Sequence, residues 1–441
     1  MKKLVILLLV AAMVLGSLVG VFMYAGFRDQ TQEGPFADVP APVIGSYRFA
    51  DFRGADLSKE DFKVEPPGMF YTFTFDTSTK WPHGEKTPDA DLAREILEKG
   101  KYPGLGLSSL LQEGITGRGV HVAVIDKPIA EQHRAFARGL NYIEVSPEHP
   151  NTGRTHFHGA AVAGILSGQY GVAPESGLYY FAVPDDTEPY ARYAEAMEKI
   201  LELQDSLPGS AKIRVVAIAH GLDPADVATN AGGAKDWSQA IDKARQQGII
   251  VIYPGMPGLS FTGTGCPPGK DRDNPENYEL WSWTRVKQEI AGKLESRQIR
   301  SWDDARTMLI RLLTQEKELD SLQAEAINTF IYIGYVYKNY LEFDQWLDSV
   351  LLDDPGQVLA IPADYLTVPN VAGPDEYTYY GAGGLSWSTG YLAGLVTLGL
   401  QVKPDATEQE IFEALWQSST PFYGQSRLAN PIEYISTLTG D

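Results

Sequence analysis

The segment His121-Val-Ala-Val-Ile-Asp126 places an acidic residue directly after a short, almost wholly apolar run. Runs of this length, rich in β-branched residues, are typical of a strand that is buried on both faces of a sheet. In open sheets of parallel strands, reactive side chains gather where the strands end. The segment therefore predicts a buried parallel strand with Asp126 at the functional edge of the sheet.

The residues on both sides of this segment alternate between strand and helix patterns. Apolar runs predict strands at 178–183, 213–219 and 249–253, whereas 190–203 and 237–247 have helical periodicity. Short links between such elements imply a parallel sheet that is covered by helices on both faces. The sequence thus predicts an α/β fold of three layers, with a mostly parallel sheet between helices.

Two further segments carry a reactive residue at the start of a helix built from small side chains. His158-Gly-Ala-Ala-Val-Ala-Gly begins with a histidine, and Gly384-Leu-Ser386-Trp-Ser-Thr-Gly-Tyr-Leu-Ala-Gly394 places a serine near its beginning. Small side chains let two such helices pack close to the sheet, so that residues far apart in the chain can meet. Each segment alone is weak evidence, but Asp126, His158 and Ser386 together suggest a catalytic triad.

As a set, these segments resemble the subtilisin-like serine peptidases, the subtilases. That family has an aspartate after an apolar strand, the motif His-Gly-Thr-x-Val-Ala-Gly, and the motif Gly-Thr-Ser-x-Ala-x-Pro-x-Val-Ala-Gly. Flanking pieces also match, namely Gly114-Ile-Thr-Gly-Arg-Gly and Gly171-Val-Ala-Pro. The resemblance covers about residues 101–270 and 356–420. It implies a subtilisin-like fold and hydrolysis of peptide bonds through an acyl-enzyme.

The resemblance implies a role for each residue of the triad and for two glycines. Ser386 is the expected nucleophile, His158 the base that takes its proton, and Asp126 the acid that orients the imidazole. In the family, the strands that match the residues leading to Gly221 and Gly255 line the primary pocket and pair with the substrate backbone. These two glycines are therefore the expected substrate-binding residues.

One departure from the family concerns the group that stabilises the oxyanion. Where the family has Ala-Gly-Asn, this chain has Pro254-Gly255-Met256, and a methionine cannot donate the hydrogen bond that the asparagine supplies. Loss of such a donor lowers turnover by about 10²–10³ where it has been removed. Either the activity is reduced or another donor serves. The candidates lie just downstream: Ser260, Thr262, Thr264 and Asn274.

This departure leaves two functions open. The first is a serine endopeptidase that acts on protein or peptide substrates. The second is a catalytically weak or inactive subtilase-like protein that serves as a binding or scaffold protein at the cell surface. An α/β-hydrolase esterase does not fit, because its histidine must follow the serine and the last histidine here is His220. No cofactor is expected, since the sequence has no zinc motif; structural calcium is frequent in the family but cannot be located.

The composition of the 441 residues is that of a globular chain with an acidic surface. Hydrophobic residues make up 44% and charged residues 21%, and the formal net charge is -20. Nucleic acid is not an expected partner, because phosphate binding needs clustered lysine and arginine. Cys266 is the single cysteine, so the chain can form no internal disulfide.

The first 28 residues are expected to form a signal or a transmembrane anchor. Lys2 and Lys3 precede an uncharged run at 4–27, which as a helix would be about 36 Å long and could cross a hydrocarbon core of about 30 Å. A cleaved signal peptide is the alternative, although the small residues of a cleavage site are poorly matched. The lysines predict a cell-membrane protein with an extracytoplasmic catalytic domain, and a secreted protein is the alternative.

The rest of the chain is expected to have two main parts. Residues 29–100 form an N-terminal extension or a pro-segment, in which alternating aromatic residues predict a strand from Met69 to Phe75. Residues 101–441 form the peptidase domain. Within it, helical spacing at about 270–355 predicts a helical insertion, one of whose helices begins at Ser301.

Overall fold

The part of the chain that the computed structural model describes begins at residue 46. It comprises residues 46–59, 67–82, 90–149, 155–184, 188–222, 224–295, 299, 301–316, 319–337 and 357–440. The expected membrane segment at 4–27 lies outside these ranges. Within them, no helix combines the length and the apolar composition needed to cross a bilayer.

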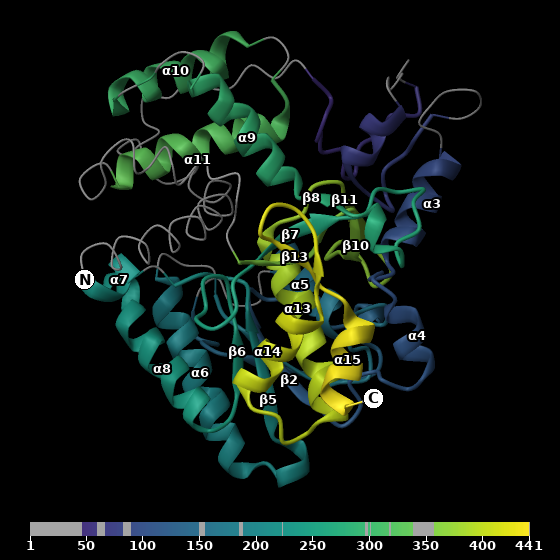
Figure 1. Ribbon diagram of the computed structural model, residues 1–441, viewed down its shortest axis with the longest axis vertical. Coiled ribbons are helices and arrows are strands. Elements are labelled where there is room, and N and C mark those ends of the chain that lie inside the picture. The colour runs from purple at the N-terminus through teal and green to yellow at the C-terminus, as the bar shows by residue number, and fades with distance from the viewer. Residues whose placement is uncertain are drawn as a thin grey trace.

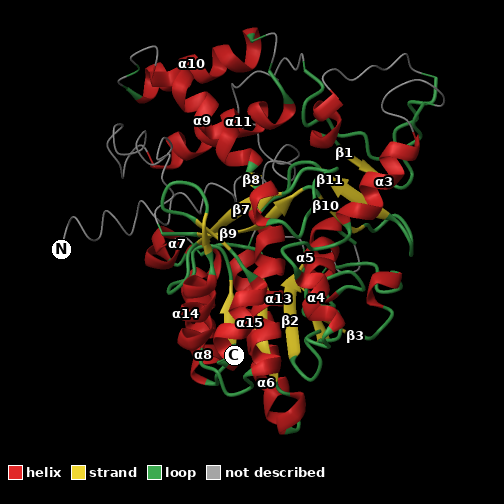
Figure 2. Cartoon of the chain, turned by 45° about the vertical axis from the view of Figure 1, so that its right-hand side comes forward, coloured by secondary structure: helices red, strands yellow, loops and turns green. Residues whose placement is uncertain are grey.

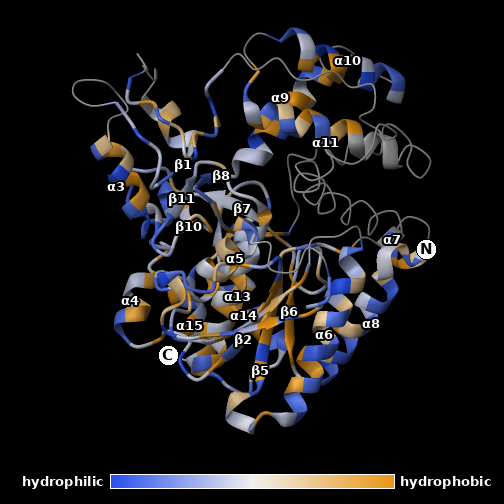
Figure 3. Ribbon diagram, turned by 180° about the vertical axis from the view of Figure 1, so that it is seen from behind, coloured by the Kyte–Doolittle hydropathy of each residue, from blue (hydrophilic) through white to orange (hydrophobic). Residues whose placement is uncertain are grey.

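A sheet of five parallel strands lies at the centre of the molecule (Figure 1). Its strands follow the order β3-β4-β2-β5-β6. Their bounds are β2 (His121–Asp126), β3 (Leu140–Glu144), β4 (Gly177–Ala182), β5 (Ile213–Ile218) and β6 (Ile250–Ile252). Strands buried on both faces need apolar residues throughout, and Figure 3 shows hydrophobic residues concentrated on the central strands.

Helices cover both faces of this sheet. On one face α6 (Pro189–Ser206) packs against α8 (Ala234–Gln246), and on the other α5 (Phe157–Ser167) packs against α13 (Leu385–Val402). The predicted α/β fold, with a parallel sheet between two helical layers, is therefore confirmed. The remaining helices around this core are α3 (Ala90–Gly100), α4 (Leu107–Gln112), α7 (Pro224–Thr229), α14 (Glu408–Ser418) and α15 (Pro431–Thr439).

Two smaller sheets adjoin the start of α13. The first has the order β12-β13-β9-β7-β8, and the second has the order β1-β11-β10 with antiparallel pairing throughout. Because α13 packs against both β5 and β9, it joins the first small sheet to the central one. The bounds are β1 (Thr74–Asp76), β7 (Phe261–Gly265), β8 (Glu279–Leu280), β9 (Leu359–Asp364), β10 (Leu366–Pro369), β11 (Tyr377–Tyr380), β12 (Thr420–Pro421) and β13 (Arg427–Leu428).

Helices fill the described part of the segment between β8 and β9. They are α9 (Ser282–Glu295), α10 (Trp302–Gln315) and α11 (Ser321–Tyr337), and Figure 2 shows them gathered at one end of the molecule. Ser301 begins α10 as its sequence predicts, because its hydroxyl accepts the N–H of Asp304 at 3.2 Å. The division of the chain into domains stays a prediction.

The strand predicted from Met69 to Phe75 is wrong. Residues Pro67–Thr72 form a 3-10 helix, and only Thr74–Asp76 is extended. Three aromatic side chains of this segment, Phe70, Phe73 and Phe75, are all buried in one apolar cluster. The rings of Phe70 and Phe75 stack with centroids 5.4 Å apart, so residues before and after the end of the 3-10 helix share this cluster.

Candidate active site

The aspartate at the end of β2 and the histidine in the first turn of α5 form a buried pair. The Nδ1 atom of His158 lies 2.8 Å from Oδ2 and 2.9 Å from Oδ1 of Asp126. An ionised carboxylate can only accept a hydrogen bond, so Nδ1 carries the proton. In the neutral imidazole Nε2 is then the basic nitrogen, which is the tautomer that a general base requires.

The carboxylate of Asp126 stays ionised although its side chain is only 6% exposed. Burial alone would raise its pKa. The charge of His158, the hydrogen bond from its ring and the N–H of Lys127 nevertheless hold the pKa of Asp126 below its ordinary value. The carboxylate is therefore charged at any pH at which a histidine acts as a base, and it can accept the hydrogen bond from Nδ1.

Two neighbours that the sequence analysis left without a role fix the position of His158. The ring of His156 caps α5 by accepting the N–H of His158 at 3.2 Å, and the N–H of His156 donates to the carbonyl of Pro128 at 2.7 Å. A side chain at Gly159 would collide with the hydroxyl of Tyr180, so only glycine lets α5 approach β4 this closely. Histidine is not among the usual capping residues, and therefore no sequence signal indicated this cap.

Ser386 is the second residue of α13, whose N-cap is Gly384. Its side chain is 5% exposed, and its hydroxyl donates to the carbonyl of Ala219 at 3.4 Å, just beyond the end of β5. The ring of the next residue, Trp387, contacts the ring of His158 with centroids 5.7 Å apart. The structure thus brings the serine segment and the histidine together at the ends of β2 and β5, which are neighbouring parallel strands.

Small residues permit this approach of α13 to α5. A Cβ atom added to Gly390 would lie 2.7 Å from the carbonyl oxygen of Val162, and one added to Gly394 would lie 2.5 Å from the side chain of Val172. The N-terminal end of the 18-residue helix α13 therefore lies within the site. Its first N–H groups and the positive end of its dipole favour negative charge that develops on an oxygen beside Ser386.

The residues expected to bind substrate follow β5 and β6, which are neighbours in the central sheet. Gly221 is buried and Gly255 is exposed. Gly255 has a φ of 85°, a backbone conformation that glycine adopts without strain. Met256, at the expected oxyanion position, is 3% exposed. The roles of these three residues stay predictions.

Two of the alternative oxyanion donors, Thr264 and Asn274, form hydrogen bonds with nearby backbone groups. The hydroxyl of Thr264 donates to the carbonyl of Glu279 at 2.6 Å. The side-chain oxygen of Asn274 accepts the N–H of Glu276 at 3.0 Å and caps a short 3-10 helix. Thr264 is thereby the weakest of the four candidates, because its single hydroxyl proton is already donated.

His220 is a second histidine close to the triad. Its ring lies between Tyr190 and Tyr193, with centroids 5.3 Å and 5.2 Å away. Burial, and to a lesser extent the charge of His158, lower the pKa of His220 to about 4. The ring is therefore neutral at neutral pH, and it adds no positive charge close to the triad.

Cys266 does not support a thiol-based chemistry. Burial raises the pKa of Cys266 to about 11, so its reactive thiolate form is scarce. Among the described residues, no group of three or more His, Cys, Asp and Glu side chains is arranged to hold a metal ion. Structural calcium stays a prediction from the family resemblance.

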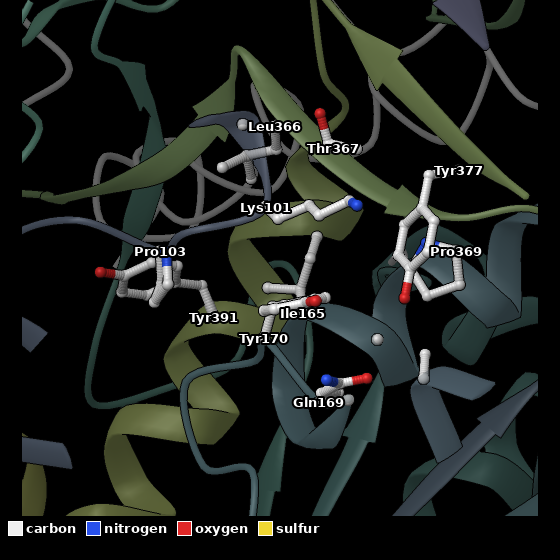
Figure 4. A pocket seen from close by; sticks show the side chains of 14 residues that line it. Lys101, Pro103, Ile165, Gln169, Tyr170, Leu366, Thr367, Pro369, Tyr377 and Tyr391 are labelled. Carbon is white, nitrogen blue, oxygen red and sulfur yellow. The ribbon is translucent and has the colours of Figure 1, made fainter. Parts of the chain in front are cut away.

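The hollow shown in Figure 4 lies at the end of α5 that is remote from His158. Its wall includes Gly164 and Gly168 near the C-terminal end of this helix. It also includes Lys101, whose ammonium group lies over the ring of Tyr377 at 4.4 Å. No residue of the triad lines this hollow, and we assign no step of the reaction to it.

Comparisons with known proteins agree with the resemblance seen in the sequence. A model of the subtilase family, described as family S8 of peptidases, matches residues 117–253, which include Asp126 and His158 but not Ser386. No curated protein matches the chain. The family match confirms the resemblance, and it supports proteolysis at the level of the family.

Several solved structures are similar to this chain. The prenylagaramide maturation protease PagA has 17% identity and a TM-score of 0.43, with 76% of this chain and 99% of that chain covered. Fervidolysin from Fervidobacterium pennivorans, a keratinolytic enzyme related to subtilisin, has 13% identity and a TM-score of 0.44, with 75% and 45% covered. The PatG macrocyclase domain has 12% identity and a TM-score of 0.41, with 76% and 95% covered.

Proposed function

We propose that this chain, a subtilase over residues 117–253, is a serine endopeptidase that hydrolyses protein or peptide substrates. The observation that carries the proposal is the buried pair of Asp126 and His158 next to the helix start that bears Ser386. A hydroxyl needs a base to become a nucleophile, and the base needs an acid to fix its tautomer. These three residues supply all three groups.

In the acylation step, Oγ of Ser386 attacks the carbonyl carbon of the peptide bond, and its proton moves to Nε2 of His158. Asp126 stabilises the imidazolium through the hydrogen bond at Nδ1. The oxyanion lies against the first N–H groups of α13. The imidazolium then gives its proton to the leaving amine, the C–N bond breaks, and the acyl group stays on Ser386.

In the deacylation step, water takes the place of the released amine. His158 removes a proton from this water, which attacks the ester carbonyl. The second tetrahedral intermediate collapses when the imidazolium returns the proton to Oγ of Ser386. The products are a carboxylic acid, which loses its proton to solvent, and the enzyme in its starting state.

A catalytically weak or inactive binding protein at the cell surface is the second candidate function. Met256 favours it, because a buried thioether at the expected oxyanion position donates no hydrogen bond. The pair of Asp126 and His158 favours the enzyme. Burying a carboxylate costs desolvation energy, and in an enzyme this cost is offset because Asp126 orients the base.

Labelling with a fluorophosphonate probe separates the two functions. The probe reacts covalently with an activated serine, so the full-length chain is expected to label and Ser386→Ala is not. Equal labelling of both proteins would assign the reactive serine to another position. Absence of label from both would instead support the binding protein.

A further inference from the structure

The loop that leads into the nucleophile helix is bound by two buried side chains. Gly383 lies three residues before Ser386, and both of its backbone polar groups are taken. Its N–H donates to Oδ1 of Asp364 at 2.9 Å, and its carbonyl accepts Nε1–H of Trp281 at 2.9 Å. Asp364 is 1% exposed and Trp281 is 3% exposed, so water does not compete for these bonds.

Gly383 and the ring of Trp281 each pack closely against the backbone of a neighbouring strand. A Cβ atom added to Gly383 would collide with the carbonyl of Ala363, and it would lie 3.1 Å from the ring of Trp387, the residue after the nucleophile. The ring of Trp281 lies on Gly263 of β7, where an added Cβ atom would come within 2.5 Å of it. The position of the loop is therefore set by β7, by β9 and by the indole between them.

Asp364 connects the same loop to the helical insertion. It is the last residue of β9, and its Oδ2 accepts the N–H of Ser282, the first residue of α9, at 2.7 Å. A carboxylate at a helix N-terminus stabilises the helix through its unpaired N–H groups. One carboxylate thus holds both the start of the insertion and Gly383.

The N-terminal extension holds the loop from its other end. The N–H of Gly381 donates to the carbonyl of Phe73 at 2.9 Å. The extension is in turn tied to the insertion by Arg48, whose guanidinium lies 3.3 Å from the carboxylates of Glu289 and Asp320. The N-terminal extension and the helical insertion therefore both bind the loop before Ser386, and they also contact each other.

We propose that Trp281 and Asp364 are positioning residues for the nucleophile, an inference that rests on the proposed function. They fix Gly383, and Gly383 fixes the path of the chain into α13 and so the direction of the Ser386 hydroxyl. A displacement of about 1 Å of a reacting group costs about 10²-fold in rate. The insertion then supports the position of the nucleophile through Trp281 alone, although it brings no residue into contact with the reacting atoms.

The test compares Trp281→Phe with Trp283→Phe in the full-length chain. Both changes remove an indole from the start of α9, and both side chains are buried, but only Trp281 is hydrogen-bonded to Gly383. Labelling by the fluorophosphonate is followed over a range of probe concentrations. In Trp281→Phe the maximal labelling rate is expected to fall about tenfold or more with an unchanged half-saturating concentration, whereas Trp283→Phe keeps the wild-type rate.

A second readout does not depend on activity. Hydrogen exchange is expected to accelerate at residues 381–387 in Trp281→Phe but not in Trp283→Phe, at temperatures well below unfolding of either variant. The inference is overturned by a wild-type labelling rate in Trp281→Phe, or by the same exchange in both variants. If the wild-type chain itself does not label, the proposed function fails, and hydrogen exchange alone decides whether Trp281 positions the loop.

Discussion

Asp126 and His158 each have a hydrogen bond with a residue that is near in the sequence, whereas the loop before Ser386 is bound by residues that are distant in the sequence. In the acid–base half, residues 117–253, the N–H of Lys127 donates to Asp126 and the ring of His156 accepts the N–H of His158, each within two positions. In the nucleophile half, residues 254–440, the loop before the serine is bound by side chains 19 and 102 positions away. The backbone beside the acid and the base is thus supported by local hydrogen bonds, although the two side chains lie 32 positions apart and Trp387 contacts the ring of His158. The loop before the nucleophile depends on tertiary contacts.

Asp126→Asn is expected to have the largest effect, because it changes the tautomer of the base. The amide can donate to Nδ1, which moves the ring proton to Nε2 and leaves no acceptor for the serine proton. Turnover should fall by about 10⁴-fold, as it does when this change is made in a Ser-His-Asp triad. Labelling kinetics measure the effect, and Asp236→Asn on the exposed side of α8 serves as the control. Retention of more than about a tenth of the rate would break the acid–base assignment.

Asp364→Asn tests whether the carboxylate that binds the loop before Ser386 is buried in the folded chain. The measured quantity is the pH dependence of the free energy of unfolding. Burial raises the pKa of Asp364 to about 6, although hydrogen bonds from Ser282 and Gly383 oppose this rise. The ordinary value is 3.8, so the folded chain binds the proton more tightly than the unfolded chain does. Asp364 therefore weakens the fold as the pH rises from about 4 to about 6, whereas asparagine does not titrate.

We expect the difference in the free energy of unfolding between the wild-type chain and Asp364→Asn to change with pH. Relative to Asp364→Asn, the free energy of unfolding of the wild-type chain should be about 2 kcal/mol smaller at pH 8 than at pH 4. Urea unfolding followed by tryptophan fluorescence measures it at both pH values. A difference that stays constant across this range would show that the carboxylate titrates normally and is not held in a dry site.

Met256→Asn, at the junction of the two halves, is expected to have the smallest effect. If the missing donor limits the rate, the asparagine should raise the labelling rate by about tenfold or more. Met256→Leu keeps the apolar volume without a donor, and should leave the rate unchanged. An equal rate in all three proteins would mean that another group already serves the oxyanion.

Much of the acid–base half could be predicted from the sequence because its signals are local. The apolar run before Asp126 and the helical periodicity at 190–203 lie within β2 and α6 as the structure has them. The prediction failed at 69–75, where aromatic residues have the spacing of a strand but pack through a 3-10 helix. Tertiary burial in one aromatic cluster overrode the local pattern there.

The contacts around the nucleophile could not be predicted in the same way. Trp281 lies just before the helices of the insertion, and nothing near it in the sequence indicates a bond to Gly383. Asp364 ends a strand, as Asp126 does, yet one binds backbone N–H groups and the other a histidine. Which partner an aspartate meets at the end of a strand depends on the chain that folds over it, and the sequence pattern of the strand does not contain that information.

The pairing of β1 with β11 also affects how the molecule meets other copies of itself. β11 lies between β1 and β10, so its backbone groups are hydrogen-bonded on both sides. The ring of Phe75 from β1 covers Tyr379, which is fully buried. A chain that lost β1 would present an open strand edge with exposed aromatic side chains, and such an edge recruits strands from other molecules. β1 thus covers an edge of β11, and we expect a chain without it to self-associate more readily.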